Sequence, residues 1–507
     1  MFTSIRSMGL FGMQSYMVNV EIDVSGGLPH FDIVGLPNTS VSEAKERVRS
    51  AIKNSGLTFP VSRITVNLAP ADTKKEGTVY DLPILLSVLA ASRQIKPIPE
   101  TSAFIGELSL SGEVRRINGA LPMVIEAMHN GVADVFVPKE NAYECSVVSG
   151  INVYPVETVS EIISFLDGTA EITPATYTPK EENFESLVDF ADVKGQFEAK
   201  RALEIAAAGG HNILLIGPPG SGKSMLAKRI PTILPDMTFE ESLETTKIYS
   251  VSGKLPADTP LITRRPFRSP HHTVSPVGLS GGGVIPKPGE ISLAHNGVLF
   301  LDELPEFSRT TMEIMRQPIE DGVISISRAQ ATVTYPCSVM LVCAMNPCPC
   351  GYYGHPTREC SCPGGAAERY LNKVSGPLLD RVDIHIEVPP VDFGKLSDSE
   401  KGEKSSDIKE RVNKARKIQQ KRLAGSGITC NAHMTARQTR EFCRMTDEAM
   451  QMLKDVFEML SLSARAYDKI LRVARTIADL DNSEIITDEH IAEAVQYRSL
   501  DRKFWGK

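Results

Sequence analysis

Eight consecutive residues, Gly217-Pro-Pro-Gly-Ser-Gly-Lys-Ser224, constrain the fold of this chain more than any other feature of its sequence. They follow the apolar run Asn212–Ile216, which predicts a strand, and precede Met225–Ile230, which predicts a helix. This order of strand, glycine-rich loop and helix is typical of a Walker A phosphate-binding loop. In such a loop, backbone N–H groups surround the β-phosphate, the lysine reaches the β- and γ-oxygens, and the hydroxyl binds Mg²⁺. We therefore expect ATP and Mg²⁺ at these positions: Gly217, Pro218, Pro219, Gly220, Ser221, Gly222, Lys223 and Ser224.

A second motif fits the same chemistry. The apolar run Val298–Leu301 predicts a strand, and it ends in two carboxylates, Asp302 and Glu303. In a Walker B strand the aspartate holds Mg²⁺ and the glutamate orients the attacking water as a general base. The alternative, a strand that happens to end in Asp-Glu, loses most of its weight once a phosphate-binding loop is present.

Three polar residues farther along the chain suit the same site. Asn346 follows the predicted strand Ser338–Ala344, where an amide can bond the γ-phosphate and the water, the sensor-1 role; taken alone it would be a turn former. Arg381 lies just before the predicted strand Ile384–Val388 and suits an arginine finger that acts on a neighbouring subunit. Arg465 begins a predicted helix and suits a sensor-2 arginine. The alternative for either arginine is a surface ion pair. If both roles hold, the protein is a ring.

The chain divides into three predicted domains and a linker. Residues 1–167 mix strands and helices, 168–186 are an acidic linker, 187–392 are an α/β nucleotide-binding core, and 393–507 are all-α. The N-terminal strands are predicted at Ser15–Val24, Phe31–Val34, Arg63–Leu68 and Val135–Pro138, and its helices at Ser40–Ser55, Asp81–Ser92 and Gly119–Asn130. The C-terminal helices are predicted at Ser405–Leu423, Thr435–Arg444, Asp447–Leu460, Ser463–Asp479 and Asp488–Ser499, with Ser461 and Thr487 as N-caps.

We expect a cytoplasmic protein that does not span a membrane. No apolar run approaches the ~18 residues that span a bilayer, and the first residues do not have the pattern expected of an export signal. The net charge of −7 by itself argues against a nucleic-acid partner. However, residues 157–192 carry nine acidic groups and one basic group, a net of −8, so the other 471 residues sum to +1. The net charge of the chain therefore reflects mainly the acidic linker region, and it does not argue against binding of DNA by the other domains.

The nine cysteines are unevenly placed. Five are scattered and read as small buried hydrophobic residues: Cys145, Cys337, Cys343, Cys430 and Cys443. The other four, Cys348, Cys350, Cys360 and Cys362, form two C-x-C pairs within 15 residues. Four thiolates at this spacing suit a tetrahedral, structural Zn²⁺ site, with His355 as a possible substitute ligand. The alternative is four unliganded thiols, because C-x-C is tighter than the commoner C-x-x-C.

Taken together, these motifs resemble a known family. Their order is that of AAA+ ATPases. Phe267–His272, Gly281–Gly283, Pro288–His295 and Gly297–Glu306 resemble the magnesium-chelatase-like branch, and within it the bacterial YifB/ComM family. The resemblance extends over essentially the whole chain. It implies an AAA+ P-loop core with an insert before the Walker B strand, an all-α C-terminal lid, a homohexameric ring, and a DNA partner, single-stranded or branched. ComM relatives are helicases that promote branch migration in recombination.

Candidate DNA-contacting segments can be read from the residues themselves. The stretch from Arg264 to Glu290 is rich in Gly, Pro and Arg, which suits a projecting loop. A hairpin pattern follows Walker B, with Arg328 near its tip, where a pore contact and a solvated charge are equally favoured. The predicted helix at Lys409–Arg422 holds seven basic residues against Glu410, and here a phosphate-binding surface and a plain solvated helix are equally favoured.

The first domain resembles the Lon protease domain, which has the ribosomal S5 domain 2-like fold. The resemblance rests on Ala69–Asp81 and on Gly106–Gly112 followed by Gly119. It places Val79 at the position of the catalytic serine and Pro122 close to that of the lysine. Neither side chain can act as a nucleophile or a base, so we expect a scaffold without protease activity.

Three functions compete. The first is a ring-shaped, ATP-driven DNA motor. The second is a chelatase-type motor that drives metal insertion or remodels a protein partner; it is disfavoured because the sequence has no acidic metal-shuttling domain. The third is an ATP-dependent protease, disfavoured by Val79 and Pro122.

Overall fold

The computed structural model describes residues 1–178, 188–283, 286–327, 332–355, 357–390, 402–460 and 462–506. Several predictions lie outside the described residues: the linker from 179 onward, Arg328, the boundary at 392/393, and Ser461. The chain forms two compact units. Unit 1 comprises Met1–Glu182, Ser242–Ile262 and Ser327–Thr334, and unit 2 comprises Asn183–Glu241, Thr263–Ile326 and Tyr335–Lys507.

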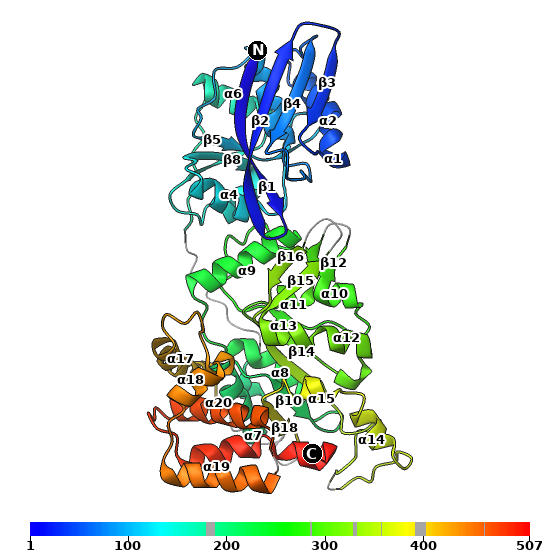
Figure 1. Cartoon of the computed structure of the whole chain (residues 1–507), viewed down its shortest axis with the longest axis vertical. Helices are drawn as coiled ribbons and strands as arrows, with labels where there is room; N and C mark the ends of the chain where they lie inside the picture. The colour runs from blue at the N-terminus through cyan, green and yellow to red at the C-terminus, as the bar shows by residue number, and fades with distance from the viewer. Residues whose placement is uncertain are drawn as a thin grey trace. The chain divides into compact units, whose positions relative to one another are not determined.

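Unit 1 is built on a mixed seven-stranded sheet with the order β3-β4-β2-β1-β5-β8-β9 (Figure 1). The strands are β1 (Phe2–Phe11), β2 (Gln14–Ser25), β3 (His30–Val34), β4 (Arg63–Ala69), β5 (Ser102–Phe104), β8 (Asp134–Pro138) and β9 (Asn152–Val156). Strands β2 and β4 alternate between buried and more exposed positions, as expected for strands with one face on a core. The four predicted strands are confirmed; β1, β5 and β9 had not been predicted.

The helices in the N-terminal segment of unit 1 are α1 (Thr39–Ser42), α2 (Ala44–Asn54), α3 (Asp81–Ala91), α4 (Ala120–His129), α5 (Lys139–Cys145) and α6 (Val159–Asp167), and a short hairpin joins β6 (Glu107–Leu108) to β7 (Val114–Arg115). Helix α3 is buried on almost every side, so it shows no amphipathic stripe. The predicted helix Ser40–Ser55 is split at Glu43 into α1 and α2, while α3 and α4 are confirmed.

Unit 2 is built on a five-stranded parallel sheet with the order β11-β14-β17-β10-β18. The strands are β10 (Ile213–Ile216), β11 (Phe267–Arg268), β14 (Val298–Leu301), β17 (Met340–Met345) and β18 (Ile384–Glu387). Strands β10, β14 and β17 are buried along their full length, which is typical of a parallel sheet covered on both faces. The sheet fits the α/β core that the motifs predict, and the carboxyl ends of its strands meet at one edge.

Helices α7 (Phe197–Gly209) and α8 (Lys223–Arg229) flank β10 in the sequence, and the long connection from α8 to β14 contains α9 (Phe239–Ser252). As predicted, the described residues of 264–290 are mostly loop. Their elements are short: β11, α10 (Pro276–Ser280), β12 (Gly281–Gly282), β13 (Lys287–Pro288) and the start of α11 (Glu290–Leu293). Beyond β14 follow α12 (Arg309–Ile314), α13 (Arg316–Asp321), the predicted hairpin of β15 (Val323–Ser327) and β16 (Thr332–Pro336), α14 (Ala366–Leu371) and α15 (Gly376–Leu379).

The described residues from 402 to 506 contain helices and no strand: α17 (Ser405–Arg422), α18 (Ala436–Phe442), α19 (Asp447–Leu460), α20 (Ala464–Leu480), α21 (Asp488–Gln496) and α22 (Ser499–Trp505) (Figure 1). The predicted helices are confirmed; α22 had not been predicted. The Ser463 hydroxyl caps α20 by accepting from the N–H of Ala466, and Thr487 caps α21 in a capping box. No helix in the described parts of the chain is both long and apolar enough to cross a membrane.

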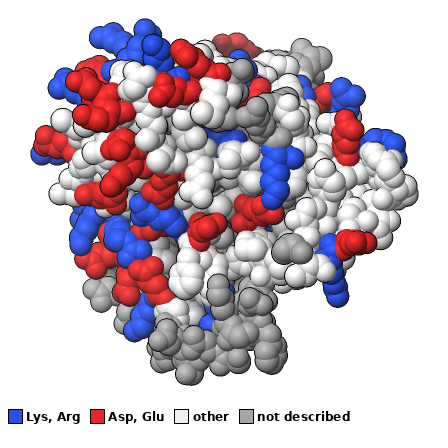
Figure 2. Space-filling model, turned by 90° about the horizontal axis from the view of Figure 1, so that it is seen from below, with Lys and Arg blue, Asp and Glu red and all other residues white. Residues whose placement is uncertain are grey.

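The seven basic residues of α17 do not form one continuous cationic surface, because Arg416 and Arg422 turn inward. Arg416 is 7% exposed and donates to the carbonyls of Ala207 and Ala208. Ion pairs take up four of the others: Lys409 with Asp236, Arg411 with Glu204 and Glu403, Lys414 with Glu410, and Arg422 with Asp479. Three basic residues stay exposed: Lys414, Lys417 and Lys421. Figure 2 shows one end of the molecule, where basic and acidic side chains are interspersed.

Candidate nucleotide site and its surroundings

The predicted phosphate-binding loop follows the carboxyl end of β10 and leads into α8. Gly220 and Gly222 adopt positive φ angles of 76° and 92°, and a Cβ at either would meet nothing within 4 Å, so the backbone here borders open space. At Gly217 a Cβ would lie 2.3 Å from the carbonyl oxygen of Val388, so only glycine fits between the loop and the chain after β18. The glycines therefore let the loop curve while it packs against the neighbouring strand.

The Lys223 side chain lies inside this loop. Its Nζ donates to the carbonyls of Gly217 (2.7 Å) and Pro218 (2.9 Å) and to Oδ1 of Asn346 (3.1 Å). Burial lowers the pKa of Lys223 to about 8, although Asp302 opposes that shift. The ammonium thus occupies the cradle that a phosphate would enter, and it contacts the predicted sensor-1 asparagine.

Ser224 and Asp302 face each other across the sheet edge. The Ser224 hydroxyl donates to Oδ2 of Asp302 at 2.6 Å, and the backbone N–H of Glu303 donates to Oδ1 of the same carboxylate. Hydroxyl and carboxylate oxygens are the hard ligands that Mg²⁺ prefers. The pair therefore fits the metal that a nucleotide would bring.

Glu303 departs from ordinary backbone geometry. Its φ of +53° is unusual for a residue other than glycine, and its side chain is 59% exposed. The carboxylate lies 3.4 Å from Nδ1 of His272, which belongs to the loop before α10. The structure thus brings Lys223, Ser224, Asp302 and Asn346 together by direct contacts, and Glu303 adjoins them through Asp302.

Gln196 also belongs to these surroundings and was missed in the sequence. It precedes α7 with a φ of +56°, and its Nε2 donates to the carbonyls of Pro389 (2.6 Å) and Ser221 (3.2 Å). Its buried Oε1 has no hydrogen-bond partner among the described residues. In the sequence, Gly195 and Gln196 stand just before a helical run. This pattern predicts the start of a helix, but it does not predict a contact between Gln196 and the phosphate loop.

The predicted arginine finger lies at the other end of the strands. Asn212, which precedes β10, donates from Nδ2 to the carbonyl of Arg381, whereas the phosphate loop leaves the opposite end of β10. A four-residue strand separates these ends by about 13 Å. The Arg381 guanidinium donates to the carbonyls of Arg316 and Pro377 and pairs with Glu320. Arg381 therefore does not join the phosphate loop of its own chain.

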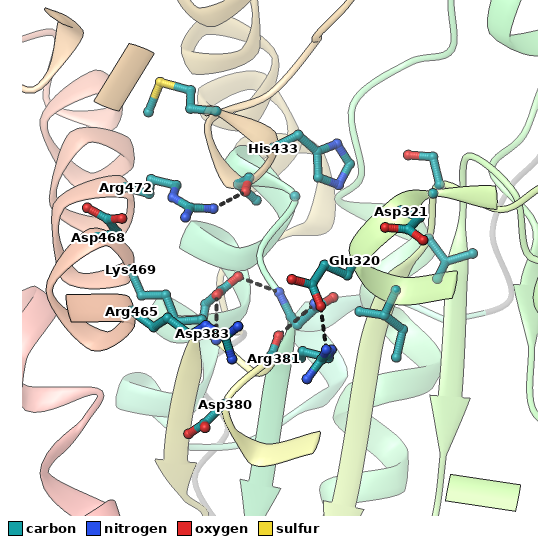
Figure 3. A pocket seen from close by; sticks show the side chains of 18 of the residues that line it. Glu320, Asp321, Asp380, Arg381, Asp383, His433, Arg465, Asp468, Lys469 and Arg472 are labelled. Atoms are coloured by element: carbon teal, nitrogen blue, oxygen red, sulfur yellow. Dashed lines mark hydrogen bonds and ion pairs between the residues drawn. The ribbon is translucent and has the colours of Figure 1, made fainter. Parts of the chain in front are cut away.

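Arg381 and Arg465 line one pocket of about 440 Å³ (Figure 3). Arg465 extends from the first turn of α20, where it is exposed. Further charged residues line the same pocket: Glu320, Asp321, Asp380, Asp383, Asp468, Lys469 and Arg472. Residues far apart in the sequence thus form one surface rich in charge.

Asp383 ties the two arginine-bearing segments together. Lys469 of α20 contacts the Asp383 carboxylate at 3.3 Å and donates to the carbonyl of Val382 at 2.9 Å. His211 contacts the same carboxylate at 3.4 Å. Burial alone would raise the pKa of Asp383, but Lys469 and His211 hold it well below its usual range. This buried charge fixes α20 beside the chain that carries Arg381.

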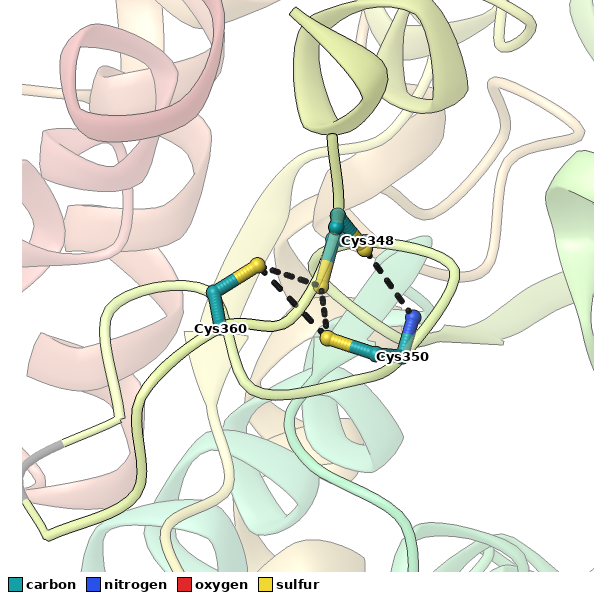
Figure 4. A group of neighbouring side chains, drawn as sticks. Cys348, Cys350 and Cys360 are labelled. Carbon is teal, nitrogen blue, oxygen red and sulfur yellow. Dashed lines mark hydrogen bonds between the residues drawn. The ribbon is translucent and has the colours of Figure 1, made fainter. Parts of the chain in front are cut away.

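The four clustered cysteines meet in one place, and their Sγ atoms lie within 4.8 Å of one another (Figure 4). Burial raises the pKa of Cys348 to about 12, whereas a hydrogen bond from the backbone of Tyr352 lowers that of Cys350 to about 5. The prediction of His355 as a substitute ligand is not supported. Its Nδ1 accepts from the backbone of Thr357 and Arg358, and the cluster consists of the cysteines alone.

The two positions that correspond to the catalytic serine and lysine of Lon proteases are buried in the N-terminal domain. Val79 is buried, and Pro122 is a buried residue of α4. A serine and a lysine also lie near these positions in the sequence, Ser87 and Lys75, although neither matches the Lon pattern. The Ser87 hydroxyl donates to the Pro83 carbonyl, and the buried Lys75 donates to carbonyl oxygens. Burial lowers the pKa of Lys75. Both side chains, those of Ser87 and Lys75, are therefore hydrogen-bonded to backbone carbonyls.

Comparison with known sequences covers nearly the whole chain. A family model described as magnesium chelatase, subunit ChlI, matches residues 189–396. Models for subunit ChlI of Mg-chelatase and for its C-terminal region match 20–141 and 402–498.

Two relatives match over almost their full length. YifB of Escherichia coli K12 is 45% identical over 504 residues, and competence protein ComM of Haemophilus influenzae is 45% identical over 505; each match covers 98% of this chain and 97% of the relative. The DNA repair protein RadA of Listeria monocytogenes is 36% identical over 95 residues, which cover 19% of this chain and 21% of RadA. The chain therefore belongs to the YifB/ComM family of magnesium-chelatase-like AAA+ ATPases.

Proposed function

We propose that this protein is a homohexameric, ATP-hydrolysing motor that acts on single-stranded or branched DNA, as a ComM-like helicase that promotes branch migration in recombination. One observation carries the proposal: Arg381 and Arg465 share a pocket at the end of the strands opposite to the phosphate loop. Arginines in this position can assist ATP hydrolysis only if they contact the γ-phosphate of a nucleotide bound to a neighbouring subunit. A ring provides that arrangement at every interface.

Within each subunit, the phosphate loop Gly217–Ser224 binds ATP. Lys223 exchanges its carbonyl contacts for the β- and γ-phosphate oxygens, and Ser224 and Asp302 hold Mg²⁺, which neutralises phosphate charge. Glu303 orients the attacking water and accepts its proton. Asn346, already in contact with Lys223, orients the γ-phosphate and the water.

The neighbouring subunit supplies positive charge for the transition state. For this, Arg381 leaves Glu320, which is largely exposed and gains solvent in return. Arg465 is already exposed and needs no partner exchange. Because Lys469 joins α20 to Val382, both arginines move with one rigid segment. The helical region from 393 onward then acts as the lid of the nucleotide site.

The remaining domains support the motor. We infer that residues 1–167 form a Lon-protease-like scaffold without proteolysis, that 168–186 link it to the core at 187–392, and that the protein works in the cytoplasm. The four cysteines hold one structural Zn²⁺, for which their mutual Sγ distances are suitable.

DNA is the partner that the relatives favour. Similarity to ComM extends over the whole chain, ComM is named a competence protein, and RadA is named a DNA repair protein. Lys414, Lys417 and Lys421 are spaced along one exposed face of α17 and suit contacts to phosphate, which do not depend on sequence. A motor that moves along any DNA requires contacts of that kind.

The deciding experiment measures ATPase rate with and without single-stranded, duplex and four-way-junction DNA, and unwinding of a labelled fork on the same preparation. We expect DNA to stimulate hydrolysis and ATP to drive strand displacement. Lys223→Ala is the negative control, because it leaves DNA contacts in place but removes the phosphate ligand. An ATPase that ignores every DNA would refute the DNA motor and favour the chelatase-type motor, to be tested next with a metal and a tetrapyrrole.

A further inference from the structure

We propose that the four-cysteine metal site sets the geometry of the nucleotide site. Bound metal holds the cysteine loop (347–355 and 357–362) against the phosphate loop and fixes Asn346 beside Lys223. This inference rests on the proposed ATPase, and it assigns to the metal a role beyond local folding: without it, the protein binds nucleotide poorly.

The sulfur positions match a tetrahedral tetrathiolate site. The Sγ atom of Cys350 lies 3.3 Å from that of Cys348 and 3.5 Å from that of Cys360. The Sγ atoms of Cys348 and Cys360 lie 3.7 Å apart. Four ligands at ~2.3 Å from Zn²⁺ would stand about 3.8 Å from each other. Backbone N–H groups point at the same sulfurs, from Gly351 and Tyr353 to Cys348 and from Cys350 to Cys362. Such donors offset the negative charge of bound thiolates.

The loop depends on this cross-link for its order. Between the end of β17 at Met345 and the start of α14 at Ala366, the described residues contain no helix or strand. Regular hydrogen bonds therefore do not hold the segment, and several of its side chains are exposed. A metal that joins residue 348 to residue 362 supplies the constraint that a hydrophobic core would otherwise provide.

One contact connects the loop directly to the phosphate loop. Gly351 has a φ of +85°, and a Cβ built on it would lie 2.3 Å from Cδ of Pro219 and 2.7 Å from Cγ. Pro219 stands between Gly217 and Gly220 in the phosphate loop, and its ring is rigid. The backbone of the cysteine loop thus rests on the outside of the phosphate cradle, at a distance that glycine alone allows.

A second connection runs along the chain. Asn346 stands two residues before Cys348, and its Oδ1 accepts from Nζ of Lys223 at 3.1 Å. The preceding carbonyl, of Met345, accepts from the N–H of Gly217 at 3.2 Å, which continues the pairing of β17 with β10 and is independent of the cysteines. The metal site therefore adjoins the phosphate loop at two points, Pro219 and Asn346. We expect release of the metal to loosen the contact with Pro219 and the position of Asn346.

The first test measures metal and nucleotide affinity on the full-length protein. We expect about one zinc per chain. A chelator used with a reversible thiol reagent, followed by reduction, should weaken binding of a fluorescent ADP analogue by about 10- to 100-fold. Adding Zn²⁺ back should restore it. Co²⁺ in place of Zn²⁺ should give the absorption bands of a tetrahedral thiolate site, which identifies the ligands without reference to activity.

The second test separates metal binding from its effect. Gly351→Ala places a methyl group against the Pro219 ring, so we expect full zinc content with nucleotide affinity reduced about tenfold or more. Gly354→Ala is the matched control. Gly354 lies in the same loop with a φ of +75°, but its Cβ would meet nothing closer than 4.0 Å. The control carries the same backbone strain and should bind nucleotide like the wild type.

Three results would overturn the proposal. The protein could be purified without metal and still bind nucleotide normally, or removal of the metal by the chelator could leave nucleotide affinity unchanged. Gly351→Ala and Gly354→Ala could also have equal effects on nucleotide affinity. Each measurement uses nucleotide binding in the absence of DNA. The coupling can therefore fail while DNA still stimulates the ATPase, and the DNA motor can fail while the coupling stands.

Discussion

The imidazole Nδ1 of His272 lies 3.4 Å from Oε2 of Glu303. This contact joins the loop that precedes α10 to the carboxylate that follows β14. The Glu303 side chain is otherwise largely exposed and extends from an unusual backbone conformation. The position of the proposed general base therefore depends on a residue of the insert and not on the Walker B strand alone.

We predict that His272→Ala lowers kcat for ATP by about tenfold without changing nucleotide affinity, because a general base contributes 10²–10⁴-fold only when it is held in position. His271→Ala is the comparison variant, since Nδ1 of His271 contacts Thr273 and not Glu303. Because its ring packs against that of His272 at 4.0 Å, we expect a smaller loss of kcat. Steady-state ATPase and ADP titrations measure the two effects. Equal losses in both variants would assign the effect to the loop as a whole.

Replacement of the base itself has a larger expected effect. Glu303→Gln should bind ATP and assemble like the wild type but hydrolyse ATP about 100- to 10,000-fold more slowly, because the amide keeps the shape and cannot accept a proton. Glu306→Gln removes a nearby exposed carboxylate that pairs with Lys373 and should be nearly silent. Single-turnover hydrolysis is the measurement, and normal turnover in Glu303→Gln would disprove the assignment.

Mixed rings test whether the arginines act on a neighbour. Arg381→Ala and Lys223→Ala should each abolish most ATPase activity, by about a thousandfold for the arginine. Mixed in equal amounts, they should regain activity, since about a quarter of the interfaces then combine an intact lysine with an intact arginine. Arg465→Ala mixed with Lys223→Ala should behave in the same way.

Arg309→Ala serves as the control for loss of an arginine, because that side chain is 86% exposed and pairs only with Glu313 one helical turn away among the contacts described. It should keep full activity on its own. Mixtures that stay inactive would place Arg381 and Arg465 in the site of their own subunit, against the 13 Å or so that the strand length imposes.

The lowered pKa of Lys223 predicts a pH dependence of nucleotide binding. Bound phosphates favour the ammonium form and raise this pKa above its value of about 8 in the free protein. Below pH 8 the lysine is charged in both states, and its titration leaves the affinity unchanged. Above pH 8 binding takes up a proton, so affinity should fall by up to about tenfold per pH unit.

ADP titrations from pH 7 to pH 9.5, about the range in which Lys223 titrates, measure this slope. Lys223→Arg is the matched control, since a guanidinium stays protonated throughout that range. Its binding, although weaker, should not follow the same slope. The same pH dependence in both proteins would assign the titration to another group.

The helices and strands that carry chemistry were largely predictable. The strands before Gly217 and Asp302 are short apolar runs bounded by the motifs themselves, and the amphipathic pattern of the C-terminal helices gave bounds within a few residues of those observed. Strand β1 mixes apolar and polar residues without strict alternation, β5 has only three residues, and β9 contains Pro155. Strands β1 and β5 lie inside the sheet, where pairing with neighbouring strands decides whether a segment is a strand, and most of that pairing is not local.

Charge was the weakest guide. The basic run on α17 left a phosphate-binding surface and a solvated helix equally favoured, and neither interpretation includes Arg416 and Arg422, which turn inward to carbonyls and to Asp479. A single sequence does not show which residues will face an acid from a distant segment. The free energy of burying a charge depends on that partner, so the same run of residues can form a binding surface or a buried network.

The sequence by itself determined the phosphate loop, the Walker B carboxylates and the family, because each is a run of adjacent residues whose spacing the chemistry of phosphate and Mg²⁺ dictates. Only the tertiary structure decided that Arg381 and Arg465 share a pocket, that His272 contacts Glu303, and that Gly351 rests on Pro219. These pairs come from segments far apart in the chain. Packing of the parallel sheet and its connections brings them together, and no local pattern of residues encodes such a distance.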